Sequence, residues 1–462
     1  MARTRPCWRA RAGCTSACTR CKACSRPQPV APVAPSGRRA LPLYRAQKYR
    51  KNSFRFVTIF VDPFCPGVPP HGTIQEGLRT VAHHARWNQV AALFAAVVAV
   101  GSNAFILTPI LREVSASLGT VPYHVAWAIS AFGAATAVSS LVLSSELDRW
   151  GPARVLSLSA LLLGVAEFTS SLSTHWVHLC LAQAIAGVAV GVLLPGTYAT
   201  TAAVSPRGKE ARFIGLVLTG WSLSLVFGVP FAAYVTEHIG WRSVYRITGT
   251  LSLIVACALW LSLRGISMSR PAERVSLRGA LRIPGVAFML LIVFGYMTAF
   301  YGTFAYFGEG LRVLLHLSAQ GAGSFVFAYG LGFGIAGLML SHFAPHASKT
   351  YIVCSLVLIS ACYFAWLPAS STRMWAFANS AVWGFLNQLG LNALIVTLNR
   401  YAAEARGVVM GIYSAVTYVA VFAGPLCMGS LYAAYGFFGV AAMAGVIVMA
   451  SAASFLAVRV HR

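Results

Sequence analysis

One acidic residue stands inside a long apolar run of this sequence. Glu167 belongs to the run 154–173, and it lies 13 residues after Arg154. At about 1.5 Å per helical residue, that distance places it past the middle of a bilayer. A carboxyl group inside a membrane is costly, and it is a place where a proton can be exchanged. Glu167 is therefore the candidate proton-coupling residue. A carboxyl that only pairs with a hydroxyl on a neighbouring helix is the alternative.

Amide and tyrosine side chains mark two further apolar runs, 283–307 and 374–398. They include Tyr296, Tyr301, Asn387, Gln388 and Asn392. Gln388 and Asn392 are four residues apart and share one face of a helix. Amides are costly on a lipid-facing surface, so these residues are candidates for binding a neutral or amphipathic solute. Hydrogen bonding between helices is the alternative explanation.

The composition excludes a soluble globular protein. Of the 462 residues, 57% are hydrophobic and only 10% are charged, whereas soluble domains carry about 25% charged residues. The net charge of +25 does not indicate nucleic-acid binding, because 16 of the 36 Lys and Arg fall in residues 1–86 and most others lie in short loops. No nucleotide-binding or hydrolase motif occurs, so we expect neither an enzyme nor a cofactor.

The first 86 residues are rich in Arg, Pro and Cys. The spacing of Cys14, Cys18, Cys21 and Cys24 would suit zinc or an iron–sulfur cluster. No histidine nearby completes such a set, and the segment has few core-forming residues. We expect a disordered basic tail without a metal, or a start assigned too far upstream.

Twelve apolar runs long enough to span a bilayer follow from Asn88 onward. They lie near 89–111, 123–143, 154–173, 177–199, 213–235, 244–264, 283–307, 321–341, 350–368, 374–398, 408–432 and 437–458. The sequence predicts an all-α polytopic membrane protein with an N-terminal half at 87–266, a basic linker at 267–282 and a C-terminal half at 283–462. Loops on the side of the linker and the C-terminus hold 15 basic residues against five opposite. This bias predicts that both ends of the bundle are cytoplasmic.

The two halves form an internal repeat with a spacing of about 195 residues. Gly228 and Pro230 in the fifth run correspond to Gly424 and Pro425 in the eleventh. Proline inside a helix removes a hydrogen bond and kinks it, while glycine permits close helix contact. These four residues are candidates for gating hinges, with tight packing as the alternative.

The charged turn between the second and third runs resembles the signature of the major facilitator superfamily. Asp148, Arg149, Gly151 and Arg154 keep the places of the pattern Gly-xxx-Asp-Arg-x-Gly-xx-Arg, and Ser144 replaces its first Gly. The resemblance implies a latch in which Asp148 lies near the cytoplasmic end of the eleventh span and Arg149 pairs locally. Simple anchoring of a basic loop at the membrane is the alternative, which we prefer for Arg154.

The fifth run resembles that of the drug:proton antiporters, in particular the arabinose-efflux and chloramphenicol-efflux branch. Two positions depart from that family's pattern. Asn103 stands where the first span often carries an acid, and Gln183 where the fourth often carries Arg. Amides can bind a polar substrate but cannot carry a proton, so Asn103 and Gln183 are candidate substrate-binding residues.

The expected function is export of a small neutral or amphipathic solute, drug-like or sugar-like, by alternating access. The resemblance places the protein in a bacterial cytoplasmic membrane as a monomer, with lipid, solute and protons as its partners. A proton-independent facilitator or exchanger is the first alternative. A transport-inactive receptor or scaffold on the same fold is the second.

Overall fold

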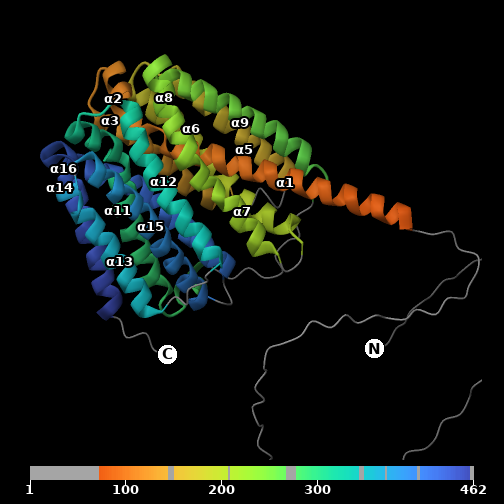
Figure 1. Cartoon of the computed structure of the whole chain (residues 1–462). Coiled ribbons are helices and arrows are strands. Elements are labelled where there is room, and N and C mark those ends of the chain that lie inside the picture. Colours follow the sequence, from red (N-terminus) through yellow and green to blue (C-terminus); the bar gives the residue numbers. More distant parts are fainter. Residues whose placement is uncertain are drawn as a thin grey trace, which may run out of the picture. The chain divides into compact units, whose positions relative to one another are not determined.

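The computed structural model describes residues 72–143, 150–206, 209–266, 277–342, 348–369, 372–402 and 406–457. Contacts divide the chain into two units, Met1–Pro69 and Pro70–Arg462, and every element below belongs to the second. Figure 1 shows this second unit as packed helices. The expected tail metal site, Cys14 to Cys24, lies outside the described residues.

The N-terminal half contains six membrane-crossing segments built from long apolar helices. The first is α1 with α2, and the fifth is α7 continued by η1 and α8. The bounds are α1 Gly72–Phe105, α2 Leu107–Ser117, α3 Pro122–Val142, α5 Pro152–Ser171, α6 Trp176–Val204, α7 Glu210–Leu223, η1 Ser224–Gly228, α8 Val229–Ile239 and α9 Trp241–Leu263. α1 is interrupted at Ile106 because Pro109 has no N–H to donate to the carbonyl of Phe105.

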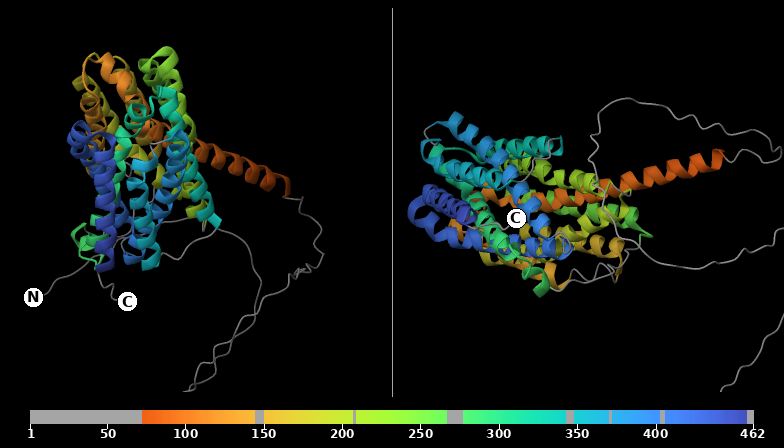
Figure 2. Two further views of the ribbon diagram at one scale, coloured as in Figure 1. Left: turned by 60° about the vertical axis from the view of Figure 1, so that its left-hand side comes forward. Right: turned by 90° about the horizontal axis from the view of Figure 1, so that it is seen from below.

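The C-terminal half repeats this arrangement, and Figure 2 shows its helices beside those of the first half. The short helix α10, Leu277–Leu281, precedes it in the linker. The bounds of the C-terminal half are α11 Val286–Leu315, α12 Ala319–His342, α13 Lys349–Phe364, α14 Trp366–Ala369, α15 Arg373–Tyr401 and α16 Arg406–Ala457. α16 holds two spans, because its backbone leaves the helical conformation at Gly436. With that division, the eleven apolar helices of the described chain make twelve crossings, which confirms the predicted fold class.

Single glycines turn the chain after the fifth and eleventh spans. Gly240 has φ 93° and ψ 153°, and Gly436 has φ 62° and ψ −159°. This backbone region is essentially restricted to glycine. The two residues are 196 positions apart and each precedes an aromatic residue, Trp241 or Phe437. The repeat seen in the sequence therefore has a common backbone turn.

The halves meet along α3 with α16 and α2 with α11, and α12 lies against α7, η1 and α8. The part of the fifth span at this interface includes η1, a single turn of π-helix directly before Val229 and Pro230. Isolated π-turns inside α-helices are found mostly at functional positions. The sequence predicted a kinked helix at Pro230. The structure has a widened helical turn just before this proline.

Candidate functional site

Two of the predicted gating residues, Asp148 and Arg149, lie outside the described residues. Gly151 follows them with φ 81° and caps the start of α5. The side chain of Arg154, one turn into α5, is exposed. The latch implied for this turn stays a prediction.

The four hinge candidates lie where helices approach closely. A Cβ placed on Gly228 would lie 2.7 Å from Oγ of Ser102 in α1, and one on Gly424 would lie 2.9 Å from the carbonyl oxygen of Thr298 in α11. Residues 102 and 298 are 196 apart, as are residues 228 and 424. Each half therefore packs its fifth helix against its first at equivalent points. Pro425 lies inside α16, where its carbonyl accepts a 2.8 Å hydrogen bond from the hydroxyl of Tyr306.

The amides Asn103 and Gln183 come together inside the N-terminal half. Nδ2 of Asn103 donates to Oε1 of Gln183 at 3.2 Å, and Nε2 of Gln183 donates to Oγ of Ser170 at 3.1 Å. Both amide side chains are buried, at 3% and 2% exposure. This network joins α1, α6 and α5. The two amides are bonded to protein groups, and Oδ1 of Asn103 alone has no partner in the described part of the chain.

Glu167 lies between α5 and α9, and not between the halves. Its side chain is fully buried, and Oε2 accepts a 2.6 Å hydrogen bond from the hydroxyl of Ser252. Among the described residues no basic side chain pairs with it, and Oε1 and the buried hydroxyl of Tyr245 have no hydrogen-bond partner. The position matches the carboxyl–hydroxyl pair between helices that the sequence left as an alternative.

Tyr296 and Asn387 are locked together in the core of the C-terminal half. The hydroxyl of Tyr296 donates to the backbone carbonyl of Asn387 at 2.8 Å and also contacts its Oδ1. Nδ2 of Asn387 donates to the hydroxyl of Tyr329 in α12 at 2.6 Å. All three side chains are buried. Gln388 and Asn392, by contrast, are partly exposed.

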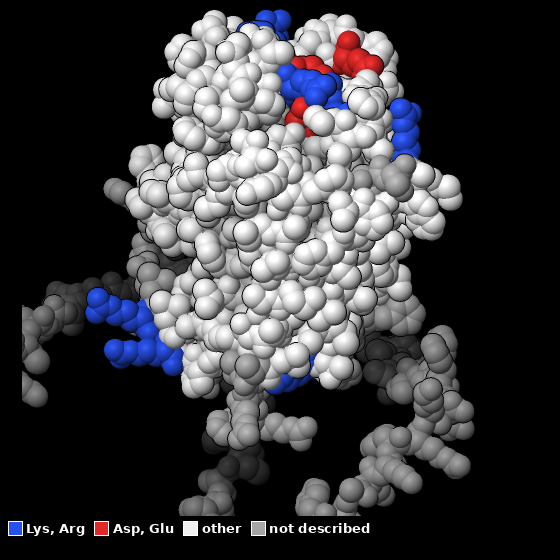
Figure 3. Space-filling model, turned by 90° about the vertical axis from the view of Figure 1, so that its left-hand side faces the viewer, with Lys and Arg blue, Asp and Glu red and all other residues white. Residues whose placement is uncertain are grey.

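A four-residue salt-bridge network joins the halves at one end of the bundle. Arg112 pairs with Glu309 at 2.9 Å, and Arg312 pairs with Glu113 at 2.6 Å. Glu309 and Arg312 are only 4% and 7% exposed, whereas Arg112 and Glu113 are 48% and 28% exposed. Figure 3 shows acidic and basic residues side by side at this end, above a flank almost free of charge.

This network was not predicted from the sequence. The sequence does contain a signal for this network, namely an acidic and a basic residue near the end of each of two spans. Arg112-Glu113 ends the first span, and Glu309 with Arg312 ends the seventh. In two halves related by a pseudo-twofold axis, opposite charges at equivalent ends can pair crosswise.

Aromatic side chains also meet between the halves. Phe105 of α1 stacks on Tyr301 of α11 with ring centroids 6.5 Å apart, and it contacts Trp221 of α7 edge-on at 5.7 Å. Nε1 of Trp221 donates to the hydroxyl of Tyr198 in α6 at 2.9 Å. Of the predicted substrate-binding residues, Tyr301 is the one that these contacts place between the halves.

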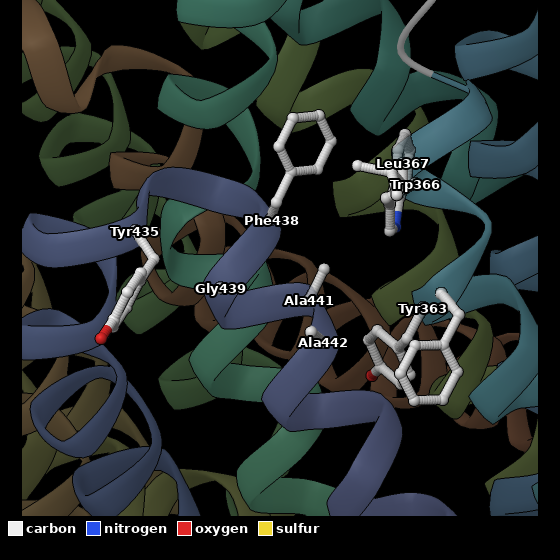
Figure 4. A pocket seen from close by; sticks show the side chains of 9 residues that line it. Tyr363, Trp366, Leu367, Tyr435, Phe438, Gly439, Ala441 and Ala442 are labelled. Atoms are coloured by element: carbon white, nitrogen blue, oxygen red, sulfur yellow. The ribbon is translucent and has the colours of Figure 1, made fainter.

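A cavity of about 420 Å³ lies elsewhere, within the C-terminal half. Figure 4 shows its wall of Trp366 and Leu367 on one side and Phe438 and Ala441 of α16 on the other. None of the residues predicted from the sequence lines it. In the described part of the chain, no group of three or more His, Cys, Asp or Glu side chains could hold a metal.

Known proteins share both the sequence pattern and the fold. The profile of the Major Facilitator Superfamily matches residues 93–425. The uncharacterized MFS-type transporters YwfA and YceJ of Bacillus subtilis strain 168 are 24% and 22% identical, covering 77% and 76% of this chain and 88% and 91% of their own. A bacterial homologue of the human lysosomal transporter Spinster, solved inward-facing and unoccupied, superposes with TM-score 0.62 at 15% identity, over 80% of this chain and 95% of that one. The chain therefore belongs to the major facilitator superfamily of membrane transporters.

Proposed function

We propose that this transporter exports a small neutral or amphipathic solute by alternating access, with protons as the counter-ion. The observation that carries the proposal is the salt-bridge network of Arg112, Glu113, Glu309 and Arg312. It links α2 to α11 across the halves, and one member of each pair is partly exposed. An ion pair with one solvent-exposed member is suited to repeated opening, because water can reach both charges once the halves separate.

The bias of basic residues supports an orientation for this network. The network lies on the side that holds five basic residues, opposite the side that holds 15. By the positive-inside rule, the salt bridges would close the outer side of a bacterial cytoplasmic membrane. Both ends of the bundle would then be cytoplasmic, and the Asp148–Arg149 turn would latch the inner side in the opposite state.

The network can be tested by exchanging its charges. Glu309→Gln should separate α2 from α11, while the swap Arg112→Glu with Glu309→Arg should restore contact. Nitroxide labels at Ala116 and Gln320, on a background without native cysteines, report the distance between the halves by pulsed electron resonance. A distance unchanged by Glu309→Gln would contradict the proposed gate.

Proton coupling by Glu167 needs its own experiment. Purified protein in vesicles that contain a pH-sensitive dye is supplied with solute, and proton flux is compared between wild type and Glu167→Gln. Glu210→Gln, just before the fifth span, is the matched control. Loss of proton flux in Glu167→Gln alone supports an antiporter, and solute movement without any proton flux contradicts one.

The buried amide pair favours a second candidate, a proton-independent facilitator or exchanger. Asn103 and Gln183 replace the charges common in related antiporters, and here they bond to each other. Glu167, bonded to Ser252, faces another helix of its own half. Solute exchange at an unchanged rate in Glu167→Gln would favour this candidate.

A further inference from the structure

Six aromatic residues form a cluster between the halves. The hydrogen-bonded amides Asn103, Gln183 and Asn387 are not part of it. The aromatic residues come from α1, α6 and α7 of the first half and from α11 and α16 of the second. The cluster consists of Phe105, Tyr198, Trp221, Tyr301, Tyr413 and Tyr418. The ring of Phe105 contacts those of Tyr301 and Trp221, and the four tyrosines lie close enough to interact electrostatically.

The faces of this cluster are only partly covered. Tyr198, Trp221, Tyr301 and Tyr413 are each partly exposed, although they lie among helices of both halves. Tyr296 and Tyr329, inside the C-terminal half, are by contrast fully buried, at 1% and 0% exposure. A partly exposed aromatic side chain between the halves offers a surface on which another flat ring can stack.

The side chains of the cluster carry no charge. In the described part of the chain, its hydrogen bond and ring contacts involve no acidic or basic side chain. The oxygen of Tyr198 accepts from Trp221, so its own hydrogen remains available to donate. No hydrogen bond engages the hydroxyl of Tyr301 among the described residues.

We infer that the solute of the proposed transport function carries a planar, uncharged aromatic ring, which stacks in this cluster while a hydroxyl donor fixes a polar group on the ring. The inference rests on the proposed function for its site between the halves. A sugar is less well matched, because Asn103, Gln183 and Asn387 are already bonded within the halves.

Matched pairs of water-soluble compounds test the requirement for a ring. Phenyl and cyclohexyl β-D-glucoside form one pair, and benzamide and cyclohexanecarboxamide the other. Binding to the full chain in lipid nanodiscs is measured by calorimetry, with empty nanodiscs subtracted. We expect each aromatic compound to bind about threefold to tenfold more tightly than its saturated partner, the range typical of aromatic pairs.

Variants locate this preference. Tyr301→Leu should abolish it, and Tyr301→Phe should keep it because the ring remains. Tyr435→Leu is the control, since Tyr435 is 71% exposed and lies outside the cluster. Equal binding of saturated and aromatic partners, binding of methyl β-D-glucoside as tight as the phenyl compound, preference for benzyltrimethylammonium, or no binding by either pair would overturn the inference.

Transport measured in parallel separates this inference from the proposed function. Flux of phenyl β-D-glucoside into vesicles is followed with the same protein. Aromatic preference in binding without flux of any solute contradicts the transport proposal and leaves the aromatic site standing. Flux of other solutes without aromatic preference contradicts the aromatic site alone.

Discussion

In the N-terminal half, the buried amides bond to each other and to a serine, whereas in the C-terminal half a buried asparagine bonds to two tyrosines. Asn103, Gln183 and Ser170 tie the first, fourth and third spans of their half. Tyr296, Asn387 and Tyr329 tie the seventh, tenth and eighth. Both networks connect the first and fourth helix of a half, but they continue to different neighbours.

The difference shows that the repeat conserves helix positions and leaves the polar chemistry free to diverge. Asn103 has Ala299 as its counterpart 196 residues later, and Glu167 has Tyr363. Each half bonds its buried amides Asn103, Gln183 and Asn387 to its own side chains, and such networks stiffen the half that contains them. The contacts between halves include salt bridges, aromatic rings and a hydrogen bond from the amide N–H of Gln320 to the carboxylate of Glu237. A change inside one half should therefore alter stability, and a change between them should alter conformation.

The largest expected effect is that of Gly424→Ala, because the contact at Gly424 differs from the equivalent contact at Gly228. A Cβ on Gly424 would meet backbone atoms of Gly302 and Thr298, whereas one on Gly228 would meet the movable hydroxyl of Ser102. We expect Gly424→Ala to lower the free energy of unfolding by about 2–3 kcal/mol and Gly228→Ala by about 1 kcal/mol or less. SDS titration measures both, with Gly411→Ala as control because its Cβ would touch nothing. Equal losses would show that the backbone of α11 can yield.

Asn387→Leu should have the next largest effect. It removes the partner of the buried Tyr329 hydroxyl and one of the two acceptors of the Tyr296 hydroxyl, which keeps the backbone carbonyl of residue 387. We expect a loss of about 2 kcal/mol in the free energy of unfolding. The same titration applies. Asn399→Leu is the control, because Asn399 is only partly buried and bonds to the backbone of its own helix. A loss no greater than that of the control would mean that the C-terminal network contributes little to stability.

Gln183→Leu should cost less, about 1 kcal/mol, because it leaves the amide of Asn103 unpaired, whereas the hydroxyl of Ser170 still donates to the carbonyl of Ala166. Adding Asn103→Leu removes the orphaned amide, so the double variant should recover part of the loss. Thermal unfolding in nanodiscs compares the single and double variants. Additive losses would show that the two amides do not depend on each other.

Glu167→Gln should have the smallest effect on stability, about 0.5 kcal/mol or less, because the amide oxygen can still accept from Ser252. Glu167→Leu, which strands that hydroxyl, should cost more. Unfolding of both variants is followed by tryptophan fluorescence. A large loss in the glutamine variant would mean that the carboxyl makes an interaction which an amide cannot replace.

Hydropathy and the repeat were sufficient to predict the fold. The expected runs at 123–143 and 154–173 correspond to α3, Pro122–Val142, and α5, Pro152–Ser171. Such agreement follows because the bilayer imposes both the length and the apolar character of each span. The π-turn at Ser224–Gly228 was not predicted, since glycine and proline indicate an irregular helix without specifying its hydrogen-bond register.

The candidate site was less predictable from the sequence. It depends on which face each helix turns toward its neighbours and on which helices of the two halves meet. Sequence placed Asn387 and Gln388 together as binding residues, yet the structure buries the first and leaves the second partly exposed. Adjacent residues on a helix point about 100° apart, so only packing decides which one faces the interface. The crosswise pairing of Arg112 with Glu309 required the same knowledge.

The turn at Gly436 makes the number of membrane crossings even. A straight α16 of 52 residues would be about 78 Å long, far more than a bilayer of about 30 Å can cover. The single left-handed glycine divides it and gives the bundle an even number of crossings. Reporters attached before α1 and after Ala457 should therefore be accessible from the same face of the membrane. An odd number would separate the two ends of the chain onto opposite faces.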